Sequence, residues 1–192
     1  MSVQERKERE RADRERLIVA TARELAEQQG WDAVTTRRLA ERIEYSQPVL
    51  YSHFRGKREI VGAVALLGAA EMATTLRTAS SAADGPRARV TALARSYLGF
   101  AERNPAVYDA MFRLDGGLVF AAEDTPEPLK DAFAAMLESL GEAAGNSVHP
   151  ALFTEVFWAA LHGLATLTRA GRLPPGDAEK RVELLVSRLA MM

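Results

Sequence analysis

Residues 41–57 read Glu-Arg-Ile-Glu-Tyr-Ser-Gln-Pro-Val-Leu-Tyr-Ser-His-Phe-Arg-Gly-Lys, and the interpretation of the whole chain starts from this stretch. Thr35 and Ser46, eleven residues apart, both carry a side-chain oxygen that can cap the N-terminus of a helix. Pro48 suits the first turn of the second helix, where its missing N–H costs little. The stretch therefore predicts two short helices joined by a tight turn.

In the second short helix, Leu50 and Phe54 are four residues apart and are predicted to face inward. The opposite side is predicted to carry Gln47, Pro48, Tyr51 and Ser52, with His53 beside them. Such a face suits the DNA major groove, where Gln47 could pair with an adenine edge and Val49 could pack on a thymine methyl group. An ordinary exposed helical corner is the alternative, and this pattern alone leaves both interpretations open.

Neighbouring runs carry a resemblance to a known family. These runs are Thr35 to Ala40, Ser46 to Phe54, Lys57 with Ile60, and the preceding helix residues Ile18, Ala22, Leu25, Ala26 and Gly30. Together they resemble, over residues 14–64, the DNA-binding domain of the TetR family of bacterial transcription regulators. The resemblance implies a three-helix helix-turn-helix domain. Glu44 occupies a turn position that is usually Gly in this family, and a positive φ there would add strain of about 1 kcal/mol.

Three further side chains are placed to contact phosphates. Thr36 and Arg37 begin the first short helix, where free N–H groups favour an anion. Lys57 lies in the first turn of the following helix, and the resemblance also implies a phosphate contact for it. The complete set predicted to contact double-stranded DNA is Thr36, Arg37, Gln47, Pro48, Val49, Tyr51, Ser52, His53 and Lys57.

Composition narrows the class of protein. The 192 residues suffice for one large or two small domains, and the absence of cysteine excludes disulfides and thiolate metal sites. Residues 1–58 hold 13 Lys or Arg against 10 Asp or Glu, and residues 59–192 hold 12 against 16, which together give the net charge of −1. A modestly basic N-terminal third joined to an acidic remainder fits a DNA-binding module attached to a second domain.

The sequence gives little evidence for a membrane protein, a secreted protein or an enzyme. The longest uninterrupted apolar runs, residues 60–70 and 157–161, are shorter than the roughly 20 residues of a membrane span, and the N-terminus lacks the apolar core of a signal peptide. We therefore expect a cytoplasmic protein without a membrane partner. His53, His149 and His162 lack metal-binding spacing, and the chain has no Gly-rich phosphate loop or serine elbow. An enzyme, a cofactor and a metal are not expected.

Three segments are expected along the chain. Residues 1–12 form a flexible charged arm, which is either a fraying tail or an arm that touches phosphates through Arg6, Lys7, Arg9 or Arg11. Residues 13–58 form the helix-turn-helix domain, with its first helix starting near Asp13, and residues 59–192 form a helical ligand-binding and dimerisation domain.

The fold class is predicted to be all-α, with about nine helices. Apolar residues recur at helical spacing and no strand pattern is present. After the short helices, we expect helices over residues 57–79, 87–103, 106–113, 129–140, 151–170 and 178–189, with a long loop over residues 115–128.

The last two helices, residues 151–170 and 178–189, carry more apolar area than the core of one chain requires, which is typical of an interface. A symmetric homodimer would place two recognition helices about 34 Å apart, on a palindromic operator. The resemblance implies the same interface, because the last two helices form a four-helix dimer interface in that family.

Residues 97–112 and 157–164 resemble a TetR C-terminal subtype with a tryptophan-histidine-glycine theme. The resemblance implies a small-molecule effector that loosens DNA binding, and an aromatic lining would favour a largely apolar one. The candidate ligand-binding residues are Tyr97, Phe100, Tyr108, Met111, Phe112, Trp158 and His162, although each could instead fill a core. Repression is expected from the family and activation stays open. The alternative is a helical interaction scaffold with weakened DNA binding.

Overall fold

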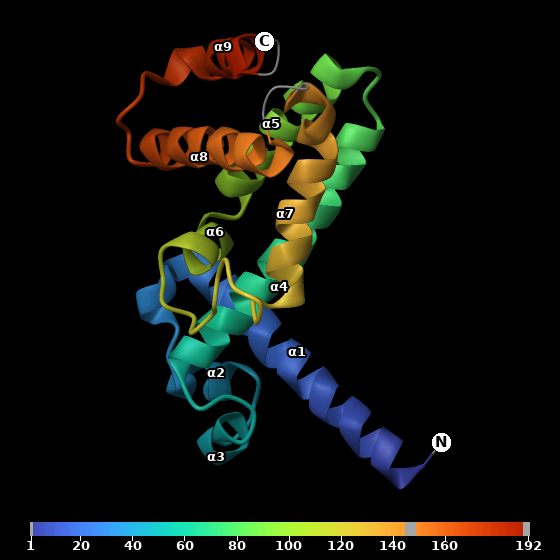
Figure 1. Ribbon diagram of the computed structural model, residues 1–192. Coiled ribbons are helices and arrows are strands. Elements are labelled where there is room, and N and C mark those ends of the chain that lie inside the picture. Colours follow the sequence, from blue (N-terminus) through green and yellow to red (C-terminus); the bar gives the residue numbers. More distant parts are fainter. Residues whose placement is uncertain (1, 145–148, 190–192) are drawn as a thin grey trace. The chain divides into compact units, whose positions relative to one another are not determined.

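The computed structural model describes residues 2–144 and 149–189, and these residues are all-helical (Figure 1). The α-helices are α1 (Val3–Gln29), α2 (Thr36–Arg42), α3 (Gln47–Tyr51), α4 (Lys57–Ser81), α5 (Pro86–Arg103), α6 (Pro105–Phe112), α7 (Glu127–Leu140), α8 (Pro150–Arg169) and α9 (Ala178–Leu189). The prediction of an all-α chain with about nine helices is confirmed. From residue 57 onward, the predicted helix ends agree with the observed ones to within two residues.

The chain divides into two compact units. Unit 1 comprises Met1–Gly68 with Asn104–Pro126, and unit 2 comprises Ala69–Arg103 with Glu127–Met192. Helix α6 and the segment after it therefore group with the N-terminal helices, which the sequence pattern does not reveal. The functional division after residues 12 and 58 stays a prediction.

Helix α1 begins at Val3, ten residues before the predicted start near residue 13. Its first turn has a capping box, in which the Glu5 backbone N–H donates to Ser2 Oγ (3.2 Å) and the Ser2 N–H donates to Glu5 Oε2 (2.7 Å). Such reciprocal capping satisfies two N–H groups that would otherwise lack partners. The prediction failed because it followed apolar spacing, whereas these turns are held by local polar contacts.

The C-terminal end of α1 holds the start of α6 within unit 1. The Glu27 carboxylate accepts hydrogen bonds from the backbone N–H groups of Ala106 (3.0 Å) and Val107 (3.1 Å). The indole Nε1 of Trp31 donates to the carbonyl oxygen of Ala106 (2.8 Å). A carboxylate at a helix N-terminus satisfies free N–H groups and complements the helix dipole. Glu27 and Trp31 thereby fix α6 on α1.

Two glycines let α4 approach α6 and the segment that follows it. A Cβ at Gly62 would lie 2.4 Å from the carbonyl oxygen of Gly116, and a Cβ at Gly68 would lie 2.2 Å from Val107 Cγ1. Any larger residue at either glycine would collide with its neighbour. The first half of α4 is thus packed directly against residues 107–116.

Unit 2 is a group of packed helices in which α5 contacts α7, α8 and α9. Tyr97 of α5 and Phe157 of α8 are fully buried in it. The Arg77 guanidinium joins the end of α4 to α7, since it donates to Asp131 Oδ1 (2.7 Å) and Glu138 Oε2 (2.9 Å). These hydrogen bonds lower the pKa of both carboxyl groups.

Two helices, α4 and α8, are long and apolar enough to cross a membrane by length and composition alone. Helices in the core of a globular protein meet the same criteria, so two such helices are weak evidence for a membrane span. They differ in burial, because 56% of the apolar window in α4 is buried and only 22% of that in α8. The exposed side of α8 therefore needs a separate explanation.

Candidate nucleic-acid interface

Helices α2 and α3 have the predicted helix-turn-helix arrangement. Thr35 precedes α2 in an extended conformation, and its side chain accepts a hydrogen bond from the Arg38 backbone N–H (3.2 Å), which confirms the predicted cap. Ser46 occupies the same position before α3, but its side chain accepts no capping hydrogen bond, and Pro48 lies in the first turn. The start of α3 is therefore set by backbone geometry and Pro48.

The turn between these helices has a left-handed residue at Glu44, with φ of 57°. The Tyr45 backbone N–H donates to the carbonyl oxygen of Ala40 (2.9 Å), which closes the end of α2. An L-residue other than Gly in this conformation costs about 1 kcal/mol or more. The backbone at Glu44 therefore has the positive φ on which the predicted strain depends.

The burial pattern of α3 is the predicted one. Leu50 is fully buried and Phe54 is 9% exposed, so these two side chains hold α3 on unit 1. The exposed side chains on the other side are Gln47, Pro48, Val49, Tyr51 and Ser52. Tyr51 Oη lies 3.3 Å from Thr36 Oγ1, which joins the exposed edges of α2 and α3. This exposed set combines the polar groups of Gln47, Tyr51 and Ser52 with two apolar residues, Pro48 and Val49.

The side chain of Arg37 is exposed next to this surface. Its Nε donates to Glu41 Oε1 (2.9 Å) within α2, and this hydrogen bond raises the pKa of Arg37. Ion pairs between exposed side chains contribute little free energy. The guanidinium can therefore exchange Glu41 for a phosphate at low cost.

Lys57 is the first residue of α4, and it is exposed. Its ammonium group donates to the backbone carbonyl oxygen of Trp31. Because the Trp31 indole also bonds to Ala106, a chain of contacts connects Lys57 to α6 inside unit 1. The sequence predicted only a core-covering role for Trp31, and nothing in the local pattern indicates this connection.

His53 is placed differently from the exposed set. Its side chain is only 5% exposed, and Nδ1 lies 3.3 Å from Glu15 Oε1 on α1. Burial alone would raise the pKa of Glu15, but the hydrogen bonds from His53 and Arg11 lower it. The expectation that His53 shares the exposed face is not met, because its ring is directed towards α1.

The predicted ligand-binding residues divide between the two units. Tyr97, Phe100, Trp158 and His162 belong to unit 2, and Tyr108, Met111 and Phe112 belong to unit 1.

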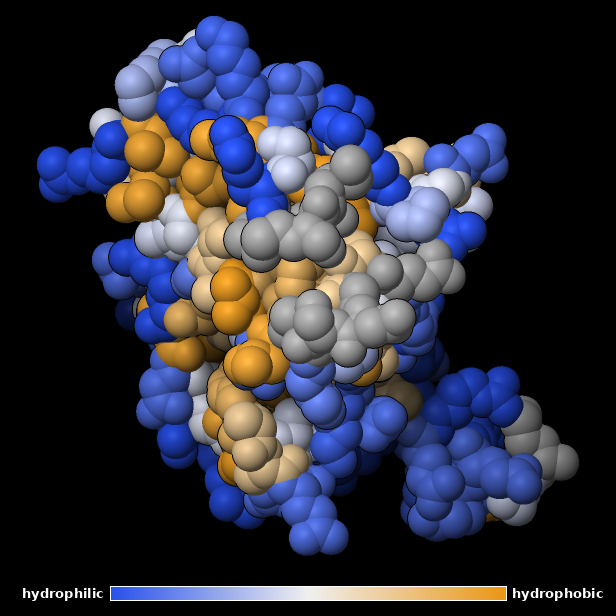
Figure 2. All heavy atoms as spheres, turned by 45° about the horizontal axis from the view of Figure 1, so that its top comes forward, coloured by the Kyte–Doolittle hydropathy of each residue, from blue (hydrophilic) through white to orange (hydrophobic). Residues whose placement is uncertain are grey.

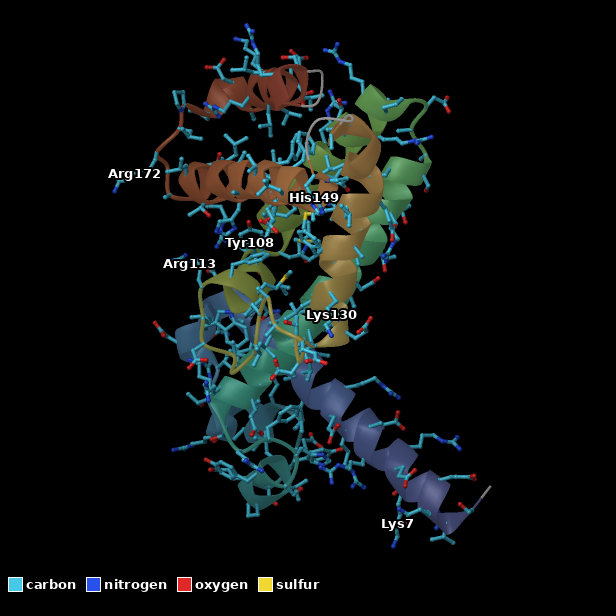
Figure 3. All side chains as sticks on the ribbon, in the orientation of Figure 1. Lys7, Tyr108, Arg113, Lys130, His149 and Arg172 are labelled. Carbon is cyan, nitrogen blue, oxygen red and sulfur yellow. The ribbon has the colours of Figure 1, made fainter. Side chains whose placement is uncertain are left out.

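In unit 2, Tyr97 and Phe100 are buried, and Trp158 Nε1 donates to Tyr97 Oη (3.0 Å). His162 is half-buried, and burial lowers its pKa, which keeps the imidazole neutral at pH 7. In unit 1, the rings of Tyr108 and Phe112 are tilted against each other with centroids 4.7 Å apart (Tyr108 is labelled in Figure 3).

A groove of about 550 Å³ lies elsewhere in unit 2, between α5 and α9. Arg87, Arg95 and Lys180 are among the residues that line it, and none of the predicted ligand-binding residues does. Among the described residues, no group of three or more His, Asp or Glu side chains could hold a metal ion. The residues that line this groove are mostly polar, whereas the ligand site predicted from the sequence has a mostly aromatic lining.

Comparison with known families covers both parts of the chain. Residues 18–64 match the family described as bacterial regulatory proteins, tetR family. Residues 90–189 match the family described as tetracyclin repressor-like, C-terminal domain. The first match spans the helix-turn-helix, and the second spans most of α5 to α9.

Individual relatives agree with this match. The chain is 31% identical over 169 residues to the tetracycline repressor protein class A from transposon 1721 of Escherichia coli, covering 86% of this chain and 72% of the relative. It is 30% identical over 190 residues to the HTH-type transcriptional repressor KstR of Mycobacterium tuberculosis, covering 95% and 82%.

A solved structure of a protein with unknown function from Rhodococcus sp. RHA1 has the same fold, with a TM-score of 0.76, 23% identity, and coverage of 91% of this chain and 92% of that one. The fold, the helix-turn-helix and both family matches agree, and they describe a DNA-binding regulator and not an enzyme. This chain belongs to the TetR family of bacterial transcription regulators.

Proposed function

We propose that this chain is a dimeric, sequence-specific transcriptional repressor that acts in the cytoplasm and leaves its DNA operator when it binds a small, largely apolar ligand. The observation that carries the proposal is the exposed face of α3, held in place by the buried Leu50 and Phe54. A helix fixed by its apolar side and open on its polar side can enter a major groove.

The proposed contacts divide into two classes. Gln47 reads bases, because its amide can donate to and accept from an adenine edge, and Val49, which is 38% exposed, can pack on a thymine methyl group. Thr36, Arg37 and Lys57 contact phosphates, which set position and affinity without reading sequence. Pro48, Tyr51 and Ser52 complete the surface, whereas the His53 ring is directed towards Glu15 of α1 and is not among the proposed contacts.

The exposed side of α8 supports a homodimer. Leu152, Val156 and Leu167 are 55%, 53% and 44% exposed, and they follow one side of the helix with Ala159 and Gly163 between them. Figure 2 brings the α8 and α9 end of unit 2 forward and shows hydrophobic side chains gathered there among hydrophilic ones. Such a stripe is typical of an interface, and a twofold axis would bury it against its own copy.

Helix α9 supports the same interface, because Leu184 is 59% exposed. We therefore propose that the dimer forms through residues 151–170 and 178–189, and that the two copies of α3 contact the halves of a palindromic operator. The low burial of α8 then follows from an interface with a second copy, and a membrane is not needed to explain it.

In unit 2, the proposed ligand-binding residues are Tyr97, Phe100, Trp158 and His162, in a C-terminal domain of the tryptophan-histidine-glycine subtype, and in unit 1 they are Tyr108, Met111 and Phe112. The Tyr97 and Trp158 contact and the neutral His162 support a site with few charges. Since Glu27 and Trp31 hold α6 on α1, a ligand that moves α6 would also move the helix-turn-helix. Only a difference in ligand affinity between the two arrangements can drive release.

The first prediction tests base reading. DNA binding is measured by fluorescence anisotropy, with duplexes from the region upstream of the protein's own coding sequence and with an unrelated duplex. Gln47→Ala is expected to reduce the preference for the upstream duplex by about 1–3 kcal/mol, and Lys57→Ala to weaken binding to both duplexes alike. Equal losses on both duplexes for both variants would contradict the two classes of contact.

A helical interaction scaffold with weakened DNA binding is the second candidate function. The strain at Glu44 and the net charge of −1 favour it. It predicts a wild-type protein that still forms dimers but binds no duplex at 50 mM salt, where phosphate contacts are strong. Binding that weakens steeply as salt rises would exclude the scaffold.

A further inference from the structure

The N-terminal part of α1 extends beyond the core of unit 1 (Figure 1). Ile18 is the first buried residue of this helix, and none of residues 2–17 is buried. At 1.5 Å per residue, Lys7 lies about 16 Å along the helix from Ile18. Residues 3–17 of α1 therefore form a helical arm, and packing within unit 1 does not explain why it is helical.

Three basic side chains of this arm lie on one side. Lys7, Arg11 and Arg14 are spaced by four and three residues, and Ile18 follows Arg14 after four more. Residues at this spacing share one face of a helix. We call Lys7, Arg11 and Arg14 the basic stripe. It continues the line of the face that α1 buries in unit 1.

Contacts made by Arg11 and Glu15 show where this side is directed. Arg11 Nε donates to Glu15 Oε1 (3.0 Å), and the same oxygen lies 3.3 Å from Nδ1 of His53, two residues after α3 ends. Lys7 is one helical turn before Arg11, and in Figure 3 it extends from α1 on the side where α3 lies in Figure 1. The basic stripe therefore runs along the side of α1 that meets the end of α3.

The stripe is partly neutralised, because Arg11 pairs with Glu15 Oε1 at 3.0 Å. Within the described part of the chain Lys7 has no ion pair, and the Arg14 pair with Glu10 is long, at 3.9 Å. The remaining arginines of the arm, Arg6, Arg9 and Arg16, lie on other sides of the helix, among Glu5 and Asp13. The arm therefore has little net charge, but one side of it is basic.

We propose that the basic stripe contacts phosphates of duplex DNA that flank the base pairs contacted by α3. The inference rests on the proposed function, because the DNA is held by α3 and the arm adds to that contact. Three charges over about 10 Å of helix match a polyanion with a phosphate every 3.4 Å along each strand. The stripe would add affinity and salt dependence, and no base preference.

The test compares two triple variants with the same change of charge. K7Q/R11Q/R14Q removes the stripe, and R6Q/R9Q/R16Q removes three arginines from the other sides of the same helix. Gln has nearly the same helix propensity as Lys and Arg, so the arm stays helical, which circular dichroism checks. Binding to the upstream duplex is measured between 50 and 200 mM salt as the slope of log K against log salt concentration.

The stripe variant is expected to reduce the slope by about 2.7, because each phosphate contact contributes about 0.9. The control variant is expected to change it by less than about 1. The double variant K7Q/R14Q keeps the Arg11 pair with Glu15 and should reduce the slope by about 1.8. Base preference should be unchanged in all three.

The outcomes separate this inference from the proposed function. If the wild type binds and the stripe variant has the wild-type slope, the arm contacts no phosphates and only the inference fails. If both triple variants lose the same amount, the effect is one of overall charge, which also overturns the stripe. If the wild type binds no duplex at 50 mM salt, the proposed function fails, and the arm has no DNA to contact.

Discussion

Helices α3 and α8 expose different kinds of surface. The five residues of α3 hide Leu50 and expose Gln47 and Tyr51, which carry hydrogen-bonding groups, beside Pro48 and Val49, whereas the twenty residues of α8 bury Phe157 and Leu161 on one side and expose a second apolar stripe on the other. A polar face gains most from a partner that offers hydrogen-bonding groups, and an apolar face from one that excludes water. The difference supports the proposal that α3 contacts DNA and that α8 contacts a second copy of the chain.

The two helices also differ in what makes them helical. A five-residue helix is unstable alone, since nucleation is unfavourable, so α3 exists because Leu50 and Phe54 pack on unit 1. The twenty residues of α8 form many more intrahelical hydrogen bonds, so this helix depends less on any single packing contact. Substitutions on α3 should therefore act on stability and on recognition at separate positions, and substitutions on the stripe of α8 should act on assembly.

The largest effect is expected from Val156→Arg, in the middle of the α8 stripe. Two copies of this arginine would face each other across the twofold axis without a partner, which opposes dimer formation. Size-exclusion chromatography with light scattering should show a monomer of about 21.0 kDa in place of the dimer. Because a dimer gains about 10²–10⁴ in affinity from its second DNA contact, binding to the operator should weaken by that factor.

Val119→Arg is the matched control, since Val119 is 42% exposed in the segment after α6 and belongs to unit 1. It should leave both the mass and the DNA affinity at wild-type values. A wild-type protein that is itself monomeric, or a Val156→Arg protein that remains a dimer, would remove the interface from α8.

The sequence was sufficient to predict both of these helices. The residues that cap α2 and precede α3 reflect local backbone chemistry, and the apolar side chains all round α8 reflect its composition. The all-α class follows from the same local signals. These features depend on neighbours within about one helical turn, which a linear pattern records.

Other features depend on contacts between distant residues. Glu27 caps α6 across 79 residues, and His53 turns towards Glu15 across 38. A periodicity argument shows that such side chains are polar but not which partner each one finds. For the same reason the sequence does not show that residues 104–126 group with unit 1. It therefore predicted the aromatic residues of α5, α6 and α8 as one set, although they belong to two units.

The next largest effect is expected on stability, and it compares a buried and an exposed residue of α3. Leu50→Ala should lower the free energy of unfolding by about 2–5 kcal/mol, because it removes a fully buried leucine and leaves a cavity. Val49→Ala, at the neighbouring exposed position, should change stability by less than about 0.5 kcal/mol. Urea unfolding measures both.

In DNA binding, Val49→Ala should have a larger effect on base preference than Leu50→Ala. Under folding conditions Leu50→Ala should keep the wild-type base preference, whereas Val49→Ala should lose preference at a base pair carrying a thymine methyl group. A stability loss for Val49→Ala as large as that for Leu50→Ala would mean that α3 does not divide into a packing side and a reading side.

The smallest effect concerns the turn that orients α3. Glu44 has φ of 57°, so Glu44→Gly removes the steric cost of a left-handed L-residue, about 1 kcal/mol, while Gly adds entropy to the unfolded chain. A net gain in unfolding free energy of about 0.5 kcal/mol is expected. Glu44→Ala removes the same carboxylate but keeps a Cβ, and it should give no gain. If both variants were stabilised equally, the charge of Glu44 and not its backbone conformation would be the source, and the turn would be unstrained.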